Sequence, residues 1–147
     1  MIEMISRCDE KLAIELQEIE NEIFTTAWAS ETIKQKINAR EFKYWTYTKN
    51  DKVIAYLGVQ FINDFIEILG IGVVEKYRQK GIGKELMNEL LKYFNQSSYM
   101  KILLEVRESN STAKNLYTHF GFNKISKRKN YYKNEDADIY LKEKVYV

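Results

Sequence analysis

The chain has 147 residues, of which 45% are hydrophobic and 30% charged, a balance typical of a globular protein that forms one core. Its net charge is +2 with basic residues spread along the chain, which argues against nucleic acid as the main ligand. One cysteine, Cys8, excludes an intrachain disulfide, and no apolar run reaches the roughly 18 to 20 residues of a membrane span. With no secretory signal core near the N-terminus, a cytoplasmic protein is expected.

The first elements are predicted from short periodic patterns. Alternating residues favour an edge strand over Met1 to Ser6, and Asp9 is expected to cap a helix. The apolar positions of that helix are Leu12, Leu16, Ile19 and Ile23. Its glutamates are interpreted as a solvated outer face or, alternatively, as an acidic rim for a basic peptide; they are Glu10, Glu15, Glu18, Glu20 and Glu22.

A loop, a short helix and a hairpin are predicted next. Residues 24–29 show no period and form a loop that carries Trp28. Ser30 is expected to cap a helix that turns Ile33 and Ile37 inward. Strands over Tyr44 to Thr48 and Val53 to Ile62, joined by a polar turn, form a hairpin.

The segment from Ile68 to Asn95 organises the chain. It begins as an apolar strand interrupted by Gly70 and Gly72, and a glycine in a strand often marks a bulge or a close backbone approach. It ends as a helix with one apolar face, formed by Ile82, Leu86, Met87, Leu90, Leu91 and Phe94.

The turn between this strand and this helix has the chemistry of an anion site. The first backbone N–H groups of a helix lack intrahelical partners, and the helix dipole adds positive charge there. Gly81 and Gly83 allow close approach, while Arg78, Lys80 and Lys84 add full charges, so the turn should prefer a pyrophosphate. The spacing matches neither the dinucleotide fingerprint nor the nucleoside-triphosphate loop.

The remaining residues complete a mixed sheet. A strand over Lys101 to Arg107 follows the long helix, so it should be parallel to the glycine-bearing strand and buried beside it. Ser109, Asn110 and Ser111 can cap the next helix, whose apolar spacing is Ala113, Leu116, Tyr117 and Phe120 and which Gly121 ends. Strands over Asn123 to Tyr132 and Asp138 to Val147 are last. We predict one α/β domain over residues 1–147, with about seven strands and four helices.

The motifs resemble those of the GNAT family of N-acetyltransferases. The pattern Arg-x-x-Gly-x-Gly at Arg78 to Gly83 resembles the family's coenzyme A signature. Leu104 to Asn110, Leu116-Tyr117 and the run Arg128 to Tyr132 resemble its ribosomal-protein-alanine N-acetyltransferase branch over roughly residues 53 to 141. That branch has Pro-Trp-Ser where this chain has Ala27-Trp28-Ala29-Ser30, in a loop that helps to shape the family's acceptor site.

The resemblance implies a mostly antiparallel sheet whose central parallel pair is splayed at the cofactor site, acetyl-CoA as cosubstrate, and no metal. It implies transfer of the acetyl group to a protein N-terminal α-amine, with the alanine terminus of a small-subunit ribosomal protein as acceptor. Glu105 would be the general base and Tyr117 the general acid. The implied coenzyme-binding residues are Ile71, Gly72, Val73, Arg78, Gln79, Lys80, Gly81, Ile82, Gly83, Lys84 and Asn110.

Several residues have alternative interpretations. Glu105 lies in an apolar strand, where a salt bridge to Arg107 or another neighbour is the structural explanation, and Glu67 is a rival base. Tyr117 has the spacing of a core residue, and His119 is expected at the surface.

The function also has alternatives. The acceptor could be a lysine side chain or a small-molecule amine, or the chain could be a non-catalytic acyl-CoA-binding module. The basic segment from Lys124 to Lys133 could border a peptide groove or contact RNA.

Overall fold

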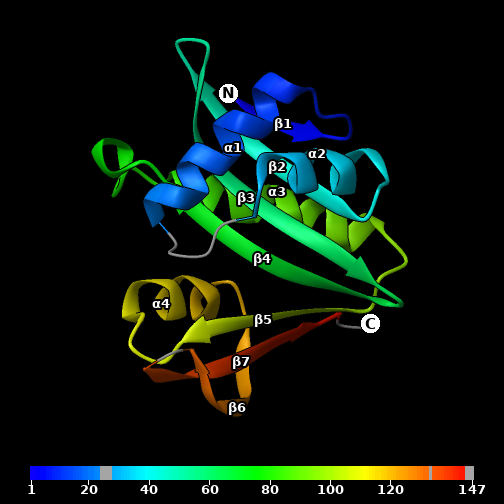
Figure 1. Cartoon of the computed structure of the whole chain (residues 1–147). Coiled ribbons are helices and arrows are strands. Elements are labelled where there is room, and N and C mark those ends of the chain that lie inside the picture. Colours follow the sequence, from blue (N-terminus) through cyan, green and yellow to red (C-terminus); the bar gives the residue numbers. More distant parts are fainter. Residues whose placement is uncertain (24–27, 133, 145–147) are drawn as a thin grey trace.

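The computed structural model describes residues 1–23, 28–132 and 134–144, and these form one seven-stranded sheet with helices on both faces (Figure 1). The strand order is β1-β2-β3-β4-β5-β7-β6. Every neighbouring pair is antiparallel except β4 with β5. The predicted α/β class and mostly antiparallel sheet are confirmed. No helix in the described part of the chain has both the length and the apolar character needed to cross a membrane.

The first half of the chain builds one face of the sheet. Strand β1 (Ile2–Ile5) pairs with β2 (Phe42–Lys49), which forms a hairpin with β3 (Lys52–Ile62). Helices α1 (Glu10–Ile23) and α2 (Ser30–Asn38) cover this face and bury Leu16, Ile33 and Ile37 against Tyr44 and Tyr56. A Cβ atom at Gly58 would lie 2.9 Å from the ring of Tyr44, so this strand position needs a glycine.

Two local predictions for these helices have different outcomes. The prediction for Asp9 is confirmed, because its Oδ1 accepts a hydrogen bond from the Leu12 N–H at 2.8 Å. The prediction for Ser30 is wrong: Ser30 is the first helical residue, and Ala29 occupies the capping position without a side-chain bond. The predicted loop at 24–29 lies mostly outside the described residues.

Strand β4 (Phe65–Val73) leaves its parallel neighbour β5 (Lys101–Arg107) after four residues. Pairing runs from Phe65 opposite Lys101 to Ile68 opposite Leu104. Just beyond, the register with β3 shifts so that Leu69 has no paired residue, which is a β-bulge beside Gly70. A bulge bends its strand and increases its twist, so β4 and β5 diverge from this point (Figure 1). The predicted splay of the central pair is confirmed.

Helix α3 (Ile82–Gln96) packs on the opposite face of the sheet from α1 and α2. The short 3₁₀ helix η1 (Glu75–Tyr77) precedes it, and α4 (Ser111–His119) follows β5. The inward residues of α3 match the predicted apolar face, with Leu86, Met87, Leu90 and Phe94 fully buried and Leu91 partly buried.

The chain ends with β6 (Asn123–Tyr132) on the sheet edge and β7 (Glu135–Glu143) beside β5. Strand β7 begins three residues before the predicted Asp138, and its predicted end at Val147 lies outside the described residues. Strand β5 is buried on one side only, because residues from Ile102 to Val106 alternate between buried and half-buried. The predicted parallel pairing with β4 is confirmed, whereas the predicted burial of β5 holds fully on one side only, and Glu105 lies on the less buried side.

Candidate active site at the divergence of two strands

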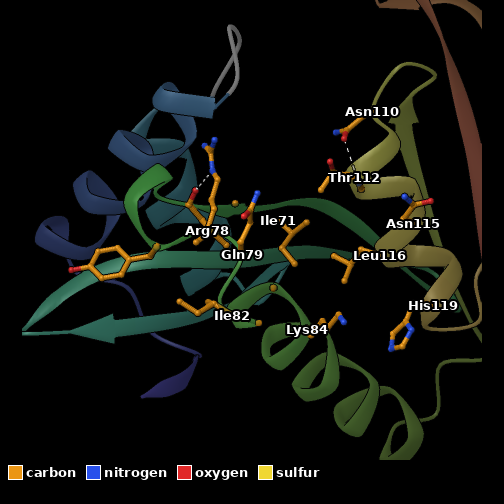
Figure 2. Close-up of a pocket in the computed structure, with 16 residues that line it drawn as sticks. Ile71, Arg78, Gln79, Ile82, Lys84, Asn110, Thr112, Asn115, Leu116 and His119 are labelled. Atoms are coloured by element: carbon orange, nitrogen blue, oxygen red, sulfur yellow. Dashed lines mark hydrogen bonds between the residues drawn. The ribbon is translucent and has the colours of Figure 1, made fainter.

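A cavity of about 730 Å³ lies where β4 and β5 diverge, between the turn that begins α3 and the helix α4 (Figure 2). Ile71 and Gln79 come from the β4–α3 side, and Thr112, Asn115 and Leu116 face them from α4. Ten of the eleven predicted coenzyme-binding residues line this cavity: Ile71, Gly72, Val73, Arg78, Gln79, Gly81, Ile82, Gly83, Lys84 and Asn110.

The turn before α3 is shaped to expose helix N–H groups. Gly81, the residue before the helix, has a left-handed backbone with φ of 82°, and Gln79 also has a positive φ of 63°. Arg78 is fixed by its own side chain, because its Nε donates to the Val73 carbonyl oxygen at 2.8 Å (Figure 2). Arg78 lines the cavity, and this bond turns its side chain back toward the end of β4.

Sequence reasoning placed Lys80 in this site and missed several lining residues. Lys80 does not line the cavity, although its neighbours on both sides do. The missed residues are Tyr77, Thr112, Ala113, Asn115, Leu116 and His119. The signal was the helical spacing of 112, 115, 116 and 119, which lie on one face of α4. His119 is exposed as predicted, and it also borders the cavity.

Asn110 combines two positions in the site. Its Oδ1 accepts a hydrogen bond from the Ala113 N–H at 3.1 Å, so it caps α4. It also lines the cavity. The predicted caps of α4 therefore reduce to Asn110, and the bond to Ala113 fixes the direction of the asparagine side chain.

Glu105 lies one residue beyond the last β4–β5 pair, on the sheet face opposite α3. Its neighbours Leu104 and Val106 are packed in the core under α3, and strand alternation turns Glu105 the other way. It forms a salt bridge to Arg128 on β6, with Oε1 and a terminal guanidinium nitrogen 2.7 Å apart. The partner considered from the sequence, Arg107, pairs instead with Glu135 at 3.2 Å.

Glu67 lies on the same face, in the last paired stretch of β4. Its Oε1 accepts a hydrogen bond from the Gln60 side-chain amide at 3.1 Å. Burial raises the pKa of this carboxyl, the Gln60 bond opposes the rise, and the nearby Glu105 charge adds to it. Two carboxylates, Glu67 and Glu105, therefore face the same space from adjacent strands.

Tyr117 lies on α4 and belongs to the hydrophobic core beside α3. Its side chain is buried and packs against Phe122 and Tyr140. Burial raises the pKa of its hydroxyl, and Tyr132 adds to the rise, so Tyr117 is neutral at pH 7. Tyr132 is also within electrostatic range of Glu105. Tyr117 is not among the residues that line the cavity.

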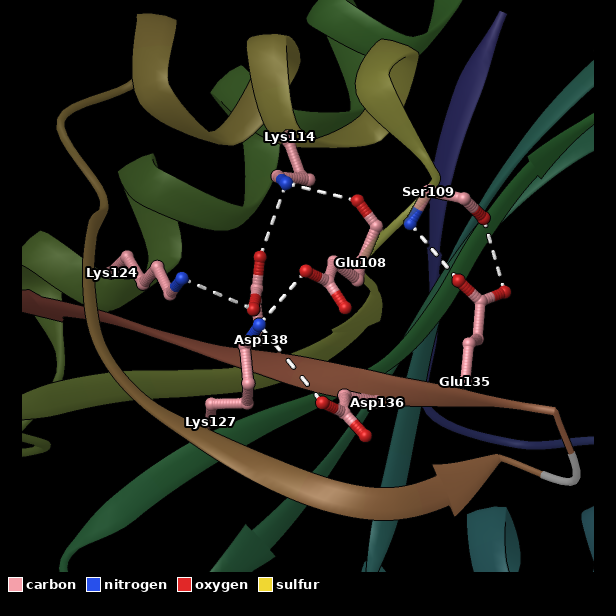
Figure 3. A network of polar contacts seen from close by, with 8 residues as sticks. All are labelled: Glu108, Ser109, Lys114, Lys124, Lys127, Glu135, Asp136 and Asp138. Carbon is pink, nitrogen blue, oxygen red and sulfur yellow. Dashed lines mark hydrogen bonds and ion pairs between the residues drawn. The ribbon is translucent and has the colours of Figure 1, made fainter.

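Three of the four basic residues of β6 form ion pairs within the protein. Lys124 pairs with Asp138 at 3.3 Å, and Lys127 pairs with Glu108 at 2.8 Å (Figure 3). Arg128 pairs with Glu105. Much of the charge that suggested RNA contact thus neutralises acidic groups of β5, of β7 and of the β5–α4 loop.

The acidic face predicted for α1 is partly wrong. Glu20 is 4% exposed and accepts a hydrogen bond from the Tyr44 hydroxyl at 2.9 Å. Glu15 accepts one from the Val53 N–H at 3.1 Å. Cys8 is buried as expected, and burial together with Asp9 raises its thiol pKa to about 11, so it is not a nucleophile at neutral pH.

No group of three or more His, Cys, Asp or Glu side chains in residues 1–23, 28–132 and 134–144 could hold a metal ion.

Comparison with known proteins identifies relatives over most of the chain. The model of the acetyltransferase (GNAT) family matches residues 13–122. A [ribosomal protein bS18]-alanine N-acetyltransferase from Haemophilus ducreyi is 33% identical over 124 residues, covering 83% of this chain and 83% of the relative. The Haemophilus influenzae protein of the same name is 32% identical over 132 residues, covering 90% and 87%.

A solved structure agrees with these relatives. The crystal structure of the ribosomal-protein-S18-alanine N-acetyltransferase from Escherichia coli has a TM-score of 0.83 and 27% identity, covering 96% of this chain and 92% of that one. Because the family model spans most of the chain and the sheet diverges beside a cavity as the motifs predicted, the chain belongs to the GNAT family of acetyltransferases.

Proposed function

We propose that this acetyltransferase uses acetyl-CoA to acetylate the N-terminal α-amine of a protein, with an alanine-initiated ribosomal protein as the acceptor. One observation carries the proposal: where β4 and β5 diverge, a cavity lies beside a basic helix N-terminus, and the carboxylates Glu67 and Glu105 lie near the divergence on the sheet face opposite α3. A thioester could therefore be held from one face and met by an amine from the other.

The coenzyme side is supported by the shape and charge of the turn before α3. A pyrophosphate there would meet the free N–H groups after Gly81 together with Arg78 and Lys84. The backbone of Ile71 to Val73 borders the cavity where β4 has lost its parallel partner. Its N–H and carbonyl groups are then available to an extended pantetheine arm and to the thioester carbonyl.

The reaction needs one base and one acid. The amine nitrogen attacks the thioester carbon, its proton passes to Glu105 directly or through water, and the carbon–sulfur bond breaks. The departing sulfur takes a proton from the neutral Tyr117 hydroxyl. An α-amine with a pKa near 8 costs roughly 1 kcal/mol to neutralise at pH 7, whereas a lysine amine near 10.4 costs roughly 4 to 5. One carboxylate suits the first acceptor better than the second.

The identity of the acceptor rests on the relatives. The named relatives are alanine N-acetyltransferases of ribosomal protein bS18, and they cover most of this chain. An acceptor of that kind also implies work in the cytoplasm, beside newly made ribosomal proteins.

A peptide panel tests the acceptor. Peptides that differ only in the first residue are incubated with acetyl-CoA and the full chain, and mass spectrometry locates the acetyl group. We expect modification of the α-amine with alanine preferred at the first position. Acetylation confined to lysine side chains or to small amines would overturn the proposal.

Two substitutions test the proposed catalytic residues. Glu105→Gln should reduce kcat at neutral pH by about 100-fold and by less at high pH, where the amine is already neutral. Equal loss at every pH would remove Glu105 from the role of base. Tyr117→Phe should lower kcat and leave the acetyl-CoA KM within about twofold, because the hydroxyl acts on the leaving sulfur.

A further inference from the structure

The salt bridge between Arg128 and Glu105 raises a chemical question that the proposed function leaves open. A carboxylate that is to receive a proton from an amine is held 2.7 Å from a guanidinium, which occupies the place where a cationic amine would bind. The pair is accessible to solvent, with side-chain exposures of 54% for Arg128 and 23% for Glu105. An ion pair of this kind is weak and can exchange partners.

Arg128 and Glu105 do not lie on adjacent strands, so strand pairing alone does not bring them together. Strand β7 lies between β6 and β5, so the arginine reaches across one whole strand to meet Glu105. Its guanidinium also lies over the ring of Tyr131, 4.3 Å from the centroid. The Glu105 carboxylate lies close enough to Tyr131 that, together with partial burial, it raises the pKa of the Tyr131 hydroxyl to about 12. Two side chains of β6 thus converge on one carboxylate.

The net charge around Glu67 and Glu105 favours the binding of a second cation. Glu67 and Glu105 lie on the same sheet face of adjacent strands, and Arg128 pairs with Glu105. Two carboxylates and one guanidinium carry one excess negative charge when both acids are ionised. An acceptor α-amine arrives mostly as an ammonium at pH 7, since its pKa is near 8.

We propose that Arg128 is a displaceable counter-ion, which holds Glu105 in the free enzyme and gives up its place to the ammonium group of the acceptor. Arg128 is then a specificity-determining residue: acceptors with a cationic amine can compete for the carboxylate, and neutral N-termini cannot. The inference rests on the proposed function, because it takes Glu105 as the group that meets the amine.

The test measures binding without turnover. The protein is saturated with coenzyme A, and the dissociation constants of two hexapeptides are measured at pH 6.5 by calorimetry. One peptide begins with alanine, and the other carries a propionyl group in place of that alanine, so that it lacks only the amine. Arg128→Gln should tighten binding of the alanine peptide by about fivefold and leave the propionyl peptide unchanged, because only the ammonium competes with the guanidinium.

Two further variants serve as controls. Lys129→Gln removes the same charge from the adjacent exposed position of β6 and should change neither constant by more than about twofold. Arg128→Lys keeps the cation and should stay close to the unsubstituted protein. Unchanged or weaker binding of the alanine peptide by Arg128→Gln, or equal tightening of both peptides, would overturn the inference.

Kinetics separate this inference from the proposed function. If Glu105→Gln retains full kcat, the base assignment fails and the proposed function with it. If Glu105→Gln loses activity while Arg128→Gln lowers kcat at unchanged peptide KM, the base stands and the counter-ion role fails, since Arg128 would then only orient Glu105. Circular dichroism and thermal unfolding of each variant verify that it is folded.

Discussion

Glu20 and Tyr44 form a buried polar pair in the core between α1 and the sheet. Tyr44 is fully buried and its hydroxyl donates to Glu20 at 2.9 Å. Burial raises the pKa of Glu20, and the Tyr44 bond opposes the rise. The pair links the last turn of α1 to β2, next to the position where Gly58 makes room for the tyrosine ring.

Removing the Tyr44 hydroxyl should therefore destabilise the folded protein. We expect Tyr44→Phe to lower the free energy of unfolding by about 1 to 3 kcal/mol, because it takes a hydrogen bond from a buried carboxyl. Urea denaturation followed by circular dichroism measures the change. Tyr47→Phe, at a half-buried position of the same strand, is the matched control and should stay within about 0.5 kcal/mol of the unsubstituted protein. Equal effects of the two substitutions would contradict this account.

At the scale of the elements, a substitution at the N-terminus of α3 should change stability and ligand binding in opposite directions. A methyl group at Gly83 would lie 3.8 Å from Ile71 Cδ1 and 3.9 Å from Leu116 Cδ2, in ordinary contact with both walls of the cavity. We expect Gly83→Ala to raise the free energy of unfolding by about 0.5 kcal/mol, because alanine favours a helix. The same methyl narrows the cavity, so the KM for acetyl-CoA should rise by roughly tenfold in steady-state assays.

Gly81→Ala should have the opposite effect on stability from Gly83→Ala. No atom lies within 4 Å of a Cβ built at Gly81, but its φ of 82° strains any other residue. This substitution should lower stability by about 1 kcal/mol. A loss of stability in both variants would show that α3 needs glycine at 83 for folding rather than for space.

The network around Asp138 joins α4 to the β6–β7 hairpin (Figure 3). Asp138 is fully buried and pairs with Lys114 at 3.1 Å and Lys124 at 3.3 Å. Burial tends to raise the pKa of Asp138, but the two ammonium groups outweigh it and the pKa is lowered from 3.8. The resulting stabilisation is present above pH 3.8 and is lost as the pH falls through the lower folded value.

Asp138→Asn should cost roughly 2 to 3 kcal/mol at pH 7, because it leaves two lysines without their shared anion. Lys124→Met removes a half-exposed partner, so it should cost less than 1 kcal/mol. Thermal unfolding between pH 2.5 and pH 7 measures both. Asp138→Asn should also lose less stability than the unsubstituted protein below pH 4; parallel curves would exclude this linkage.

Over the whole molecule, segments with a clear hydrophobic period could be predicted from the sequence, whereas side-chain contacts between elements far apart in the sequence could not. The spacing of α3 gave its buried face, and Gly70 correctly marked a bulge, because both depend on neighbours in sequence. Glu20 was assigned to the surface because its partner Tyr44 lies 24 residues away. Arg128 was likewise not expected beside Glu105, since the bulges of β6 and the intervening β7 decide that contact.

In the candidate site, too, the residues of a local motif could be predicted and those brought in by tertiary packing could not. The glycines and charges of the turn before α3 lie in one short motif, and all but Lys80 of its predicted residues line the cavity. The wall from α4 was missed because the pattern of Ala113, Leu116, Tyr117 and Phe120 also fits a core-facing helix. Only Tyr117 is fully buried, while Leu116 borders the cavity. Which face of a helix meets solvent depends on how far two strands separate.

The short pairing of β4 with β5 divides the sheet into two parts. Only Phe65 to Ile68 and Lys101 to Leu104 join these parts by backbone hydrogen bonds of the sheet. A ligand bound in the cavity would contact Ile71 to Val73 on one part and α4 on the other, and would therefore crosslink them noncovalently. Saturation with acetyl-CoA should then slow amide hydrogen exchange in residues 69–73 and 111–116 and leave exchange in β1 and β2 unchanged. Uniform slowing would mean that the two parts already move as one body.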